Sequence, residues 1–310
     1  MSGLMLMRLL IAVSVACAFG ILGLNTSNAA DERSASLDNL IPAAMQRAAL
    51  PGVIVGIWQK GQEPYVRAFG VSDTATKTPM ATNMHVRIGS NTKSFTVTAI
   101  LMLADRGLLS LDDSIDKYVK GAPNGDKITL RHLAAMRSGL FNYAEETIPK
   151  MPEEPSRQWT PRELLEISFA HPLLFSPGTA FDYSNTNTVL LGLVVEAVSG
   201  QSLKTFVEEN IIKPAGLTHT IFPVGGEMPS PHANGYIALP DGKVVDATNW
   251  DPSWGWAAGN MISTLEDMRV WSRAFANGQL FSPEMKLERD RFLSSPGEGV
   301  GSLYGLAIEY

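Results

Sequence analysis

The segment Ser90 to Lys93, with the sequence Ser-Asn-Thr-Lys, carries the residue types best able to do chemistry in this chain of 310 residues. A serine hydroxyl is a poor nucleophile at neutral pH unless a neighbouring base takes its proton. Because residues three apart share one face of a helix, Ser90 and Lys93 are predicted to lie one turn apart, with hydroxyl and amine adjacent. Free N–H groups at the helix N-terminus would also favour an oxyanion there. Ser114 to Lys117 repeats the same spacing, so the tetrapeptide alone is weak evidence.

A second candidate group is Tyr183-Ser184-Asn185, which follows a loop and precedes a predicted helix. A tyrosine hydroxyl can relay a proton when a nearby cation lowers its pKa, and Lys93 is the candidate cation. An asparagine amide offers donors and an acceptor, so Asn185 can position a lysine and hold a substrate amide. The alternative is structural, with Tyr183 as a half-buried loop aromatic and Asn185 as a helix cap.

The elements that must position these residues follow from periodicity and from capping and turn residues. An antiparallel hairpin is predicted from residues 52–58 and 65–71, after an amphipathic helix over 36–49. A strand is predicted over the last residues, 303–310. Helices are predicted over residues 91–106, 129–139, from the capping box at 160–163, and over 187–199, 201–212 and 264–277. This order predicts an α+β protein with a mostly helical second lobe.

Composition excludes several classes of function. The net charge is −6 and there is no basic run, which argues against nucleic acid as a partner. The five histidines are dispersed without the spacing of metal ligands, so neither a metal site nor another cofactor is predicted.

Residues 1–29 are predicted to form a secretory signal peptide. Arg8 precedes an apolar stretch from Leu9 to Leu24, and small residues around Ala29 fit a cleavage site. The single cysteine, Cys17, lies within this segment. We expect a secreted or periplasmic protein with no stable membrane insertion after cleavage; a retained membrane anchor is the alternative.

Taken together, the motifs resemble a known family. Ser90-x-x-Lys93, Tyr183-Ser184-Asn185 and the segment 256–264 (Trp-Ala-Ala-Gly-Asn-Met-Ile-Ser-Thr) occur in the order found in the serine DD-carboxypeptidase and class C β-lactamase family. The resemblance covers residues 35–310 and implies an antiparallel sheet flanked by helices, plus a mostly helical lobe. It also implies an acyl-enzyme on Ser90, proton transfer by Lys93 and Tyr183, and orientation by Asn185. Which of Lys93 and Tyr183 is the immediate base stays open.

The family resemblance implies a small-molecule or peptidoglycan stem-peptide substrate but leaves its identity open. A D-alanyl-D-alanine carboxypeptidase-like activity on peptidoglycan stem peptides is the leading hypothesis. The alternatives are an esterase, a β-lactamase, or an inactive protein that binds penicillin. Trp254, Trp256 and Phe141, with Tyr143, are predicted to line the substrate site, and the alternative for all four is packing within the fold.

One motif of the family is missing. The sequence contains no Lys/His-Thr/Ser-Gly tripeptide, which the resemblance places on a strand after residue 308. That strand is expected to supply the second oxyanion N–H, and loss of one such donor costs ~10²–10³ in rate. We therefore expect the C-terminal strands and helix to be missing, and the 310-residue form to be poorly stable or inactive.

Overall fold

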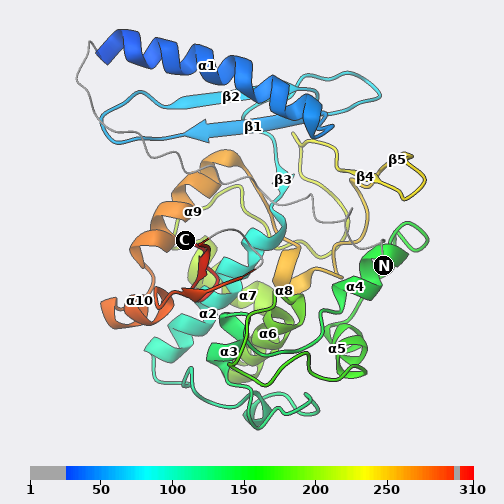
Figure 1. Ribbon diagram of the computed structural model, residues 1–310, viewed down its shortest axis with the longest axis vertical. Helices are drawn as coiled ribbons and strands as arrows, with labels where there is room; N and C mark the ends of the chain where they lie inside the picture. Colours follow the sequence, from blue (N-terminus) through cyan, green and yellow to red (C-terminus); the bar gives the residue numbers. More distant parts are fainter. Residues whose placement is uncertain (1–25, 297–300) are drawn as a thin grey trace.

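The computed structural model describes residues 26–296 and 301–310, so most of the predicted signal peptide lies outside the described residues. Figure 1 shows two regions. A layer made of helix α1 and strands β1 and β2 lies at the top and is called the hairpin layer below. Beneath it lies a helical lobe built around helices α2, α6, α7 and α8, which carries the predicted catalytic residues.

The hairpin layer forms where the apolar run over 52–58 and the turn residues after it predict it. Strand β1 (Gly52–Ile57) pairs antiparallel with β2 (Tyr65–Gly70) through a regular register. Helix α1 (Thr26–Arg47) lies along the pair and begins before the predicted residue 36. The hydroxyl of Tyr65 donates a hydrogen bond to Asp38 Oδ1 at 2.6 Å, which ties the helix to the hairpin. Every residue of β1 is only partly buried.

The helical lobe is organised by two helices that are apolar on nearly all sides. Helix α2 (Thr92–Asp105) and helix α6 (Asn185–Ser199) pack on each other at the centre of the lobe. A helix that is apolar all round must be buried on all sides, and Phe95 and Ile100 are indeed fully buried. The other lobe helices are α3 (Leu130–Ala134), α4 (Ala144–Thr147), α5 (Pro161–Phe169), α7 (Leu203–Val207), α8 (Trp256–Gly259), α9 (Leu265–Asn277) and α10 (Pro283–Arg289).

Short helical turns connect these elements. The 3₁₀ turns are η1 (Gly89–Asn91), η2 (Ile115–Lys117) and η3 (Ile148–Lys150), and the π turn η4 (Glu208–Ile212) continues α7. The predicted capping box at Thr160 is present, because its side chain accepts from the Glu163 N–H while the Glu163 carboxylate accepts in return.

The described strands outside the hairpin layer form three short antiparallel pairs. They are β3 (Val86–Arg87) with β6 (Ile262–Ser263), β4 (Tyr236–Ala238) with β5 (Val244–Asp246), and β7 (Leu293–Ser294) with β8 (Leu303–Tyr304). The β3–β6 pair matters most for the site, because it brings the residues before Ser90 beside α8.

Several predicted boundaries were wrong. The strand predicted over 303–310 is limited to Leu303–Tyr304, because the chain reverses at Ala307 (φ 56°) and Tyr310 pairs back with Leu303. The helix predicted over 129–139 ends at Ala134, since Met136 and Gly139 adopt positive φ. The helix predicted from 187 begins at Asn185, and the segment 201–212 divides into α7 and a π turn.

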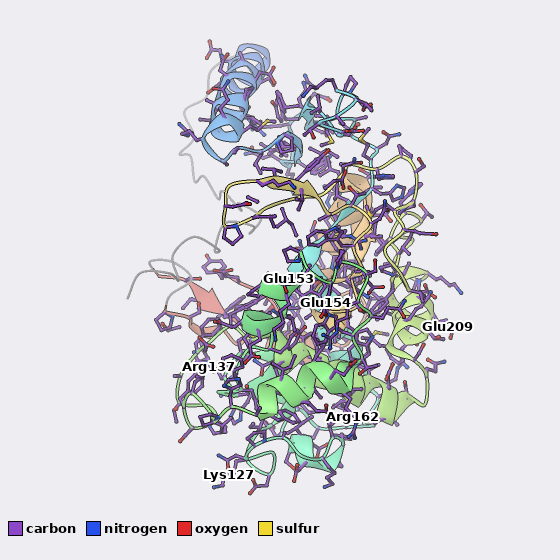
Figure 2. All side chains as sticks on the ribbon, turned by 90° about the vertical axis from the view of Figure 1, so that its right-hand side faces the viewer. Lys127, Arg137, Glu153, Glu154, Arg162 and Glu209 are labelled. Carbon is purple, nitrogen blue, oxygen red and sulfur yellow. The ribbon has the colours of Figure 1, made fainter. Side chains whose placement is uncertain are left out.

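Charged side chains lie on the outer side of the lobe. Figure 2 shows the side chains of Lys127, Arg162 and Glu209 on its outer side. Within the described residues no single helix is long and apolar enough to cross a membrane. One bent pair, 185–199 with 203–212, passes by length and composition, although its first helix supplies much of the buried core.

Candidate active site

Ser90 lies in a tight turn between a strand and a helix. Strand β3 ends at Arg87, Gly89 turns the chain with a φ of 51°, and Ser90 follows in the 3₁₀ turn η1. The prediction placed Ser90 at the start of the helix, but α2 begins two residues later, at Thr92. A left-handed φ favours glycine, so Gly89 is required by its backbone conformation rather than by lack of space. Ser90 is exposed.

Lys93, one turn further, is almost fully buried, with 2% of its surface exposed. Its Nζ donates to three oxygens from three parts of the chain. They are Ser90 Oγ at 3.0 Å, Asn185 Oδ1 at 2.7 Å and the carbonyl oxygen of Ala258 at 2.8 Å. The amine is therefore held in one place, next to the hydroxyl that it would activate.

Burial also sets the protonation of this amine. Removing a cation from water disfavours the charged form, and here it lowers the pKa of Lys93 from 10.5 to about 7. A general base works best when its pKa lies near the working pH. Lys93 can therefore hold a useful fraction of neutral amine at neutral pH while staying hydrogen-bonded to Ser90.

Tyr183, in the loop before α6, and Asn185, at the start of α6, lie next to the same amine. The Lys93 Nζ lies 4.8 Å from the centre of the Tyr183 ring, within the range of a cation–π contact. Asn185 is the first residue of α6, after Ser184 at the N-cap position. The structure thus brings Ser90, Lys93, Tyr183 and Asn185 together, although the first and last lie 95 residues apart in sequence.

The residues predicted to line the substrate site lie around this cluster with different surroundings. Trp254 is half-buried, and its carbonyl accepts a hydrogen bond from the Tyr143 hydroxyl at 2.7 Å. Trp256 is half-buried, and its ring packs over Gly192 of α6. Phe141 is half-buried and stacks on His171, with ring centres 3.8 Å apart. The roles of Trp254, Trp256 and Phe141 toward a substrate stay predictions.

Tyr143 has a different position from the one predicted. Its side chain is fully buried, so its ring packs within the lobe instead of lining an open wall. Burial, together with the nearby Tyr183 hydroxyl, raises the pKa of Tyr143. A tyrosine that stays protonated is suited to donate permanently to the Trp254 carbonyl, and it fixes the loop that precedes α8.

Two features of the site were not found in the sequence. One is Asn142, whose side-chain oxygen accepts from the backbone and side-chain nitrogens of Asn185 at 3.1 and 3.3 Å. The signal for it was a polar residue between Phe141 and Tyr143, after the turn at Gly139. The other is the Ala258 carbonyl, which no side-chain motif can reveal.

Helix α8 is fixed to α2 by threonine side chains. Thr96 donates its hydroxyl proton to the Ala257 carbonyl at 2.8 Å, and the Thr92 hydroxyl accepts from the Met261 N–H at 3.2 Å. Both threonines are fully buried. These bonds hold the Ala258 carbonyl within reach of Lys93.

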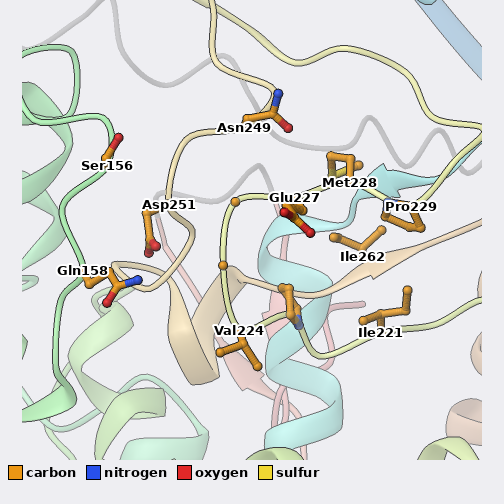
Figure 3. A pocket seen from close by; sticks show the side chains of 13 residues that line it. Ser156, Gln158, Ile221, Val224, Glu227, Met228, Pro229, Asn249, Asp251 and Ile262 are labelled. Atoms are coloured by element: carbon orange, nitrogen blue, oxygen red, sulfur yellow. The ribbon is translucent and has the colours of Figure 1, made fainter.

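A groove of about 660 Å³ lies beside the strand that pairs with β3 (Figure 3). Its apolar side includes Ile221, Val224 and Ile262, and its polar side includes Asn249 and Asp251. None of the four predicted catalytic residues lines it. Arg87 fixes one rim, because its guanidinium donates to the carbonyl oxygen of Gly226 at 2.8 Å.

Within residues 26–296 and 301–310, no group of three or more His, Cys, Asp or Glu side chains could hold a metal ion. The reactive groups are a serine, a buried lysine, a tyrosine and an asparagine on an α+β scaffold. This fold and this site define the class of β-lactamase-fold serine hydrolases, as the sequence motifs predicted.

A comparison with models of protein families agrees with this assignment. The model described as Beta-lactamase matches residues 37–306, so the chain belongs to the Beta-lactamase family. The α+β fold class and the family predicted from the motifs are confirmed.

Solved structures and curated proteins are similar to this chain. The chain is 32% identical to a D-stereospecific amidohydrolase from Streptomyces sp., with a TM-score of 0.77 over 84% of this chain and 78% of that one. It is 27% identical to the D-amino acid amidase from Ochrobactrum anthropi SV3, with a TM-score of 0.77 over 88% and 80% of the two chains. Protein flp of Staphylococcus aureus is 29% identical over 76% of this chain and 47% of its own length. The chain thus spans about half the length of the curated relatives it matches.

Proposed function

We propose that this protein is a serine hydrolase that cleaves an amide next to a D-amino acid through an acyl-enzyme on Ser90, in the manner of a D-alanyl-D-alanine carboxypeptidase. The observation that carries the proposal is the buried Lys93 amine, which is hydrogen-bonded to Ser90 Oγ at 3.0 Å and has a pKa near neutrality. The amide specificity is supported by the similarity to an amidohydrolase and an amidase whose names specify D-stereochemistry.

The proposed reaction has two halves. The neutral Lys93 amine takes the proton of Ser90 as Oγ attacks the substrate carbonyl carbon, which gives a tetrahedral oxyanion. That intermediate collapses to an ester on Ser90 as the C–N bond breaks, and the departing amine receives a proton from the site. Water then attacks the ester carbonyl with proton transfer back through the same groups, which releases the acid and restores the serine.

We propose that Tyr183 takes part in these proton transfers, which is supported by the distance of 4.8 Å between Lys93 Nζ and the centre of its ring. The order in which Lys93 and Tyr183 handle the proton belongs to the proposal. The Ser90 N–H is proposed, from the family resemblance, to be one of the oxyanion donors. A donor of this kind acts mainly on the charge that develops in the transition state.

The proposal is tested by trapping the acyl-enzyme. Purified protein is incubated with a fluorescent penicillin, and labelling is compared between the wild type and Ser90→Ala. Because Ser90 is exposed, the variant should keep its melting temperature and lose all labelling. Equal labelling of both proteins would exclude Ser90 as the nucleophile.

The substrate class is tested separately. D-amino acid amides, D-alanyl-D-alanine dipeptides, nitrocefin and p-nitrophenyl esters are assayed with the wild type and with Ser90→Ala. Turnover of the amides and dipeptides with a preference for D over L substrates would support the proposal, and it would also overturn the expectation that the 310-residue form is inactive. Turnover of esters alone, or of nitrocefin alone, would replace the amidase assignment by an esterase or a β-lactamase.

We also propose that the protein acts outside the cytoplasm on peptidoglycan stem peptides, because residues 1–29 have the composition of a secretory signal. Mass spectrometry of the protein recovered from its native host should give an N-terminus at Ala30. An intact N-terminus on protein found only inside the cell would contradict export.

A further inference from the structure

Asn142, which belongs to none of the sequence motifs, occupies a key position behind the catalytic cluster. Its side-chain Oδ1 accepts three N–H groups: Asn185 N at 3.1 Å, Asn185 Nδ2 at 3.3 Å and Ala144 N at 3.3 Å. Asn142 is half-buried, and it lies between the loop after Gly139 and the first turn of α4. One oxygen thus connects two helix starts.

Two of these donors fix the orientation of the Asn142 amide. A backbone N–H can only donate, so Asn185 N and Ala144 N require an acceptor and therefore the oxygen, not the nitrogen, of the side chain. The amide of Asn142 has only one orientation that satisfies both. The backbone thereby removes the ambiguity that an asparagine usually has.

The orientation of the Asn142 amide determines that of the Asn185 amide. Because Asn142 presents an oxygen, the Asn185 side chain must turn its Nδ2 toward Asn142 and its Oδ1 toward Lys93. A reversed Asn185 amide would place an NH₂ group against the N–H bonds of Lys93 and two oxygens against each other. The 2.7 Å bond from Lys93 Nζ to Asn185 Oδ1 is therefore set through Asn142.

The consequence appears when Lys93 loses its proton. A neutral amine has two N–H bonds and one lone pair. The two acceptors that cannot donate, Asn185 Oδ1 and the Ala258 carbonyl, take the two N–H bonds. The lone pair is left for the third neighbour, Ser90 Oγ, which can donate.

We propose that Asn142 is a positioning residue that directs the lone pair of Lys93 at Ser90 by fixing the amide orientation of Asn185. The catalytic meaning of this role depends on the proposed function, in which Lys93 accepts the Ser90 proton. Asn142 also has a geometric role, which is to orient Asn185 and the Lys93 amine. This geometric role does not depend on the proposed function.

The charges around Lys93 make this role measurable. Its three hydrogen-bonding partners, on η1, α6 and α8, are neutral oxygens. From the loop before α6 it faces the Tyr183 ring, and Tyr183 in turn acts electrostatically on the buried Tyr143. A carboxylate at position 142 would therefore be a new negative charge two hydrogen bonds from the amine.

Two variants separate orientation from charge. Asn142→Asp keeps an oxygen for all three N–H donors and adds the charge, whereas Asn142→Ala removes the acceptor. Asn210→Asp is the matched control, because Asn210 also uses its Oδ1 as an acceptor, from Arg106, but lies on η4. Melting temperatures are measured for all three variants.

The first readout needs no substrate. Protein labelled with ¹³C at lysine Cε is titrated by NMR, and the Lys93 signal is assigned by its loss in Lys93→Met. An opposite charge nearby favours a protonated lysine, so we expect the Lys93 midpoint in Asn142→Asp to rise by about one pH unit. Asn210→Asp should leave the midpoint in place, and an unchanged midpoint in Asn142→Asp would overturn the proposal.

The second readout is the rate of Ser90 acylation by the fluorescent penicillin as a function of pH. Asn142→Ala should lose about 10- to 100-fold in rate at all pH values, since a misdirected base costs catalysis without abolishing binding. Asn142→Asp should recover most of that rate above its raised midpoint. A wild-type rate in Asn142→Ala would refute the positioning role. A wild type that is never acylated would refute the proposed function and leave the NMR result to decide the geometry.

Discussion

The hairpin layer and the helical lobe differ in how completely they bury their apolar residues. In β1 every residue remains partly exposed, whereas Phe95, Ile100 and Leu101 of α2 are fully buried. The hairpin layer is tied to its own helix by a polar contact between Tyr65 and Asp38. The predicted catalytic residues all lie in the densely packed region. A buried amine with a lowered pKa can exist only where the packing excludes water, so the chemistry requires the lobe.

Removing the buried amine should have the largest effect, because it takes away the group that only the helical lobe can bury. Lys93→Met keeps the length of the side chain but removes the base, and it leaves two acceptors without their donor. We expect acylation of Ser90 to fall by about 10³-fold or more, as for loss of a general base. The measurement is single-turnover labelling with a fluorescent penicillin.

The matched control for that variant is Lys117→Met. Lys117 has the same Ser-x-x-Lys spacing, but 55% of its side chain is exposed and it pairs with Asp113 at 2.9 Å. Its acylation rate should equal that of the wild type. Equal losses in both variants would mean that the effect is not specific to the buried amine.

A pair of isoleucine substitutions tests the contrast in packing between the two regions. Ile100→Ala empties a fully buried position of α2 and should cost about 2–5 kcal/mol of unfolding free energy. Ile54→Ala in β1 removes a partly exposed side chain and should cost about half as much or less. Denaturant unfolding of both variants gives the comparison, and a larger loss for Ile54→Ala would reverse our ranking of the two regions.

The pH dependence of the unfolding free energy should also show that Lys93 is buried in the helical lobe. Lys93 loses its proton near pH 7 when folded but near pH 10.5 when unfolded. Between these values the unfolded chain binds more protons, so this residue makes the unfolding free energy rise with pH across that window. We expect a contribution on the order of a few kcal/mol, since each pKa unit is worth about 1.4 kcal/mol.

The contribution of Lys93 is obtained by subtracting the unfolding free energy of Lys93→Met from that of the wild type. Unfolding free energies of the wild type and Lys93→Met are measured at pH 7 and pH 10, where most other groups contribute equally to both proteins. The difference between wild type and variant should shift in favour of the wild type at the higher pH. A difference that stays constant would show that the Lys93 pKa is not lowered by folding.

The smallest expected effect lies in the hairpin layer. Tyr65→Phe removes the hydroxyl that donates to Asp38 and should cost about 0.5–1.5 kcal/mol, the usual net value of one hydrogen bond. Because this contact lies outside the lobe, acylation of Ser90 should not change. A loss of acylation without loss of the fold would show that the two regions are coupled more tightly than their contacts indicate.

Much of the fold was predictable because its signals are local. The hairpin from residue 52 to residue 70, the capping box at Thr160 and the helix stop at Gly278 depend on neighbouring residues, and each was found where it was predicted. Boundaries failed where the backbone changed direction for reasons outside the local pattern. The reversal at Ala307 places a non-glycine residue at φ 56°, which no propensity predicts.

The candidate site divides in the same way. The sequence by itself predicted that Ser90 and Lys93 lie one turn apart with hydroxyl and amine adjacent, and it named Tyr183 and Asn185 as their partners. The tetrapeptide spacing alone could not distinguish Lys93 from Lys117, and the choice of Lys93 depended on the other motifs of the family. In the tertiary structure Lys117 is exposed, and its bond to Asp113 raises its pKa, whereas burial lowers the pKa of Lys93. Only the tertiary structure decided the opposite pKa shifts of these two lysines and the contributions of Asn142 and the Ala258 carbonyl. The physical reason is that desolvation and hydrogen-bond direction depend on atoms that are distant in sequence.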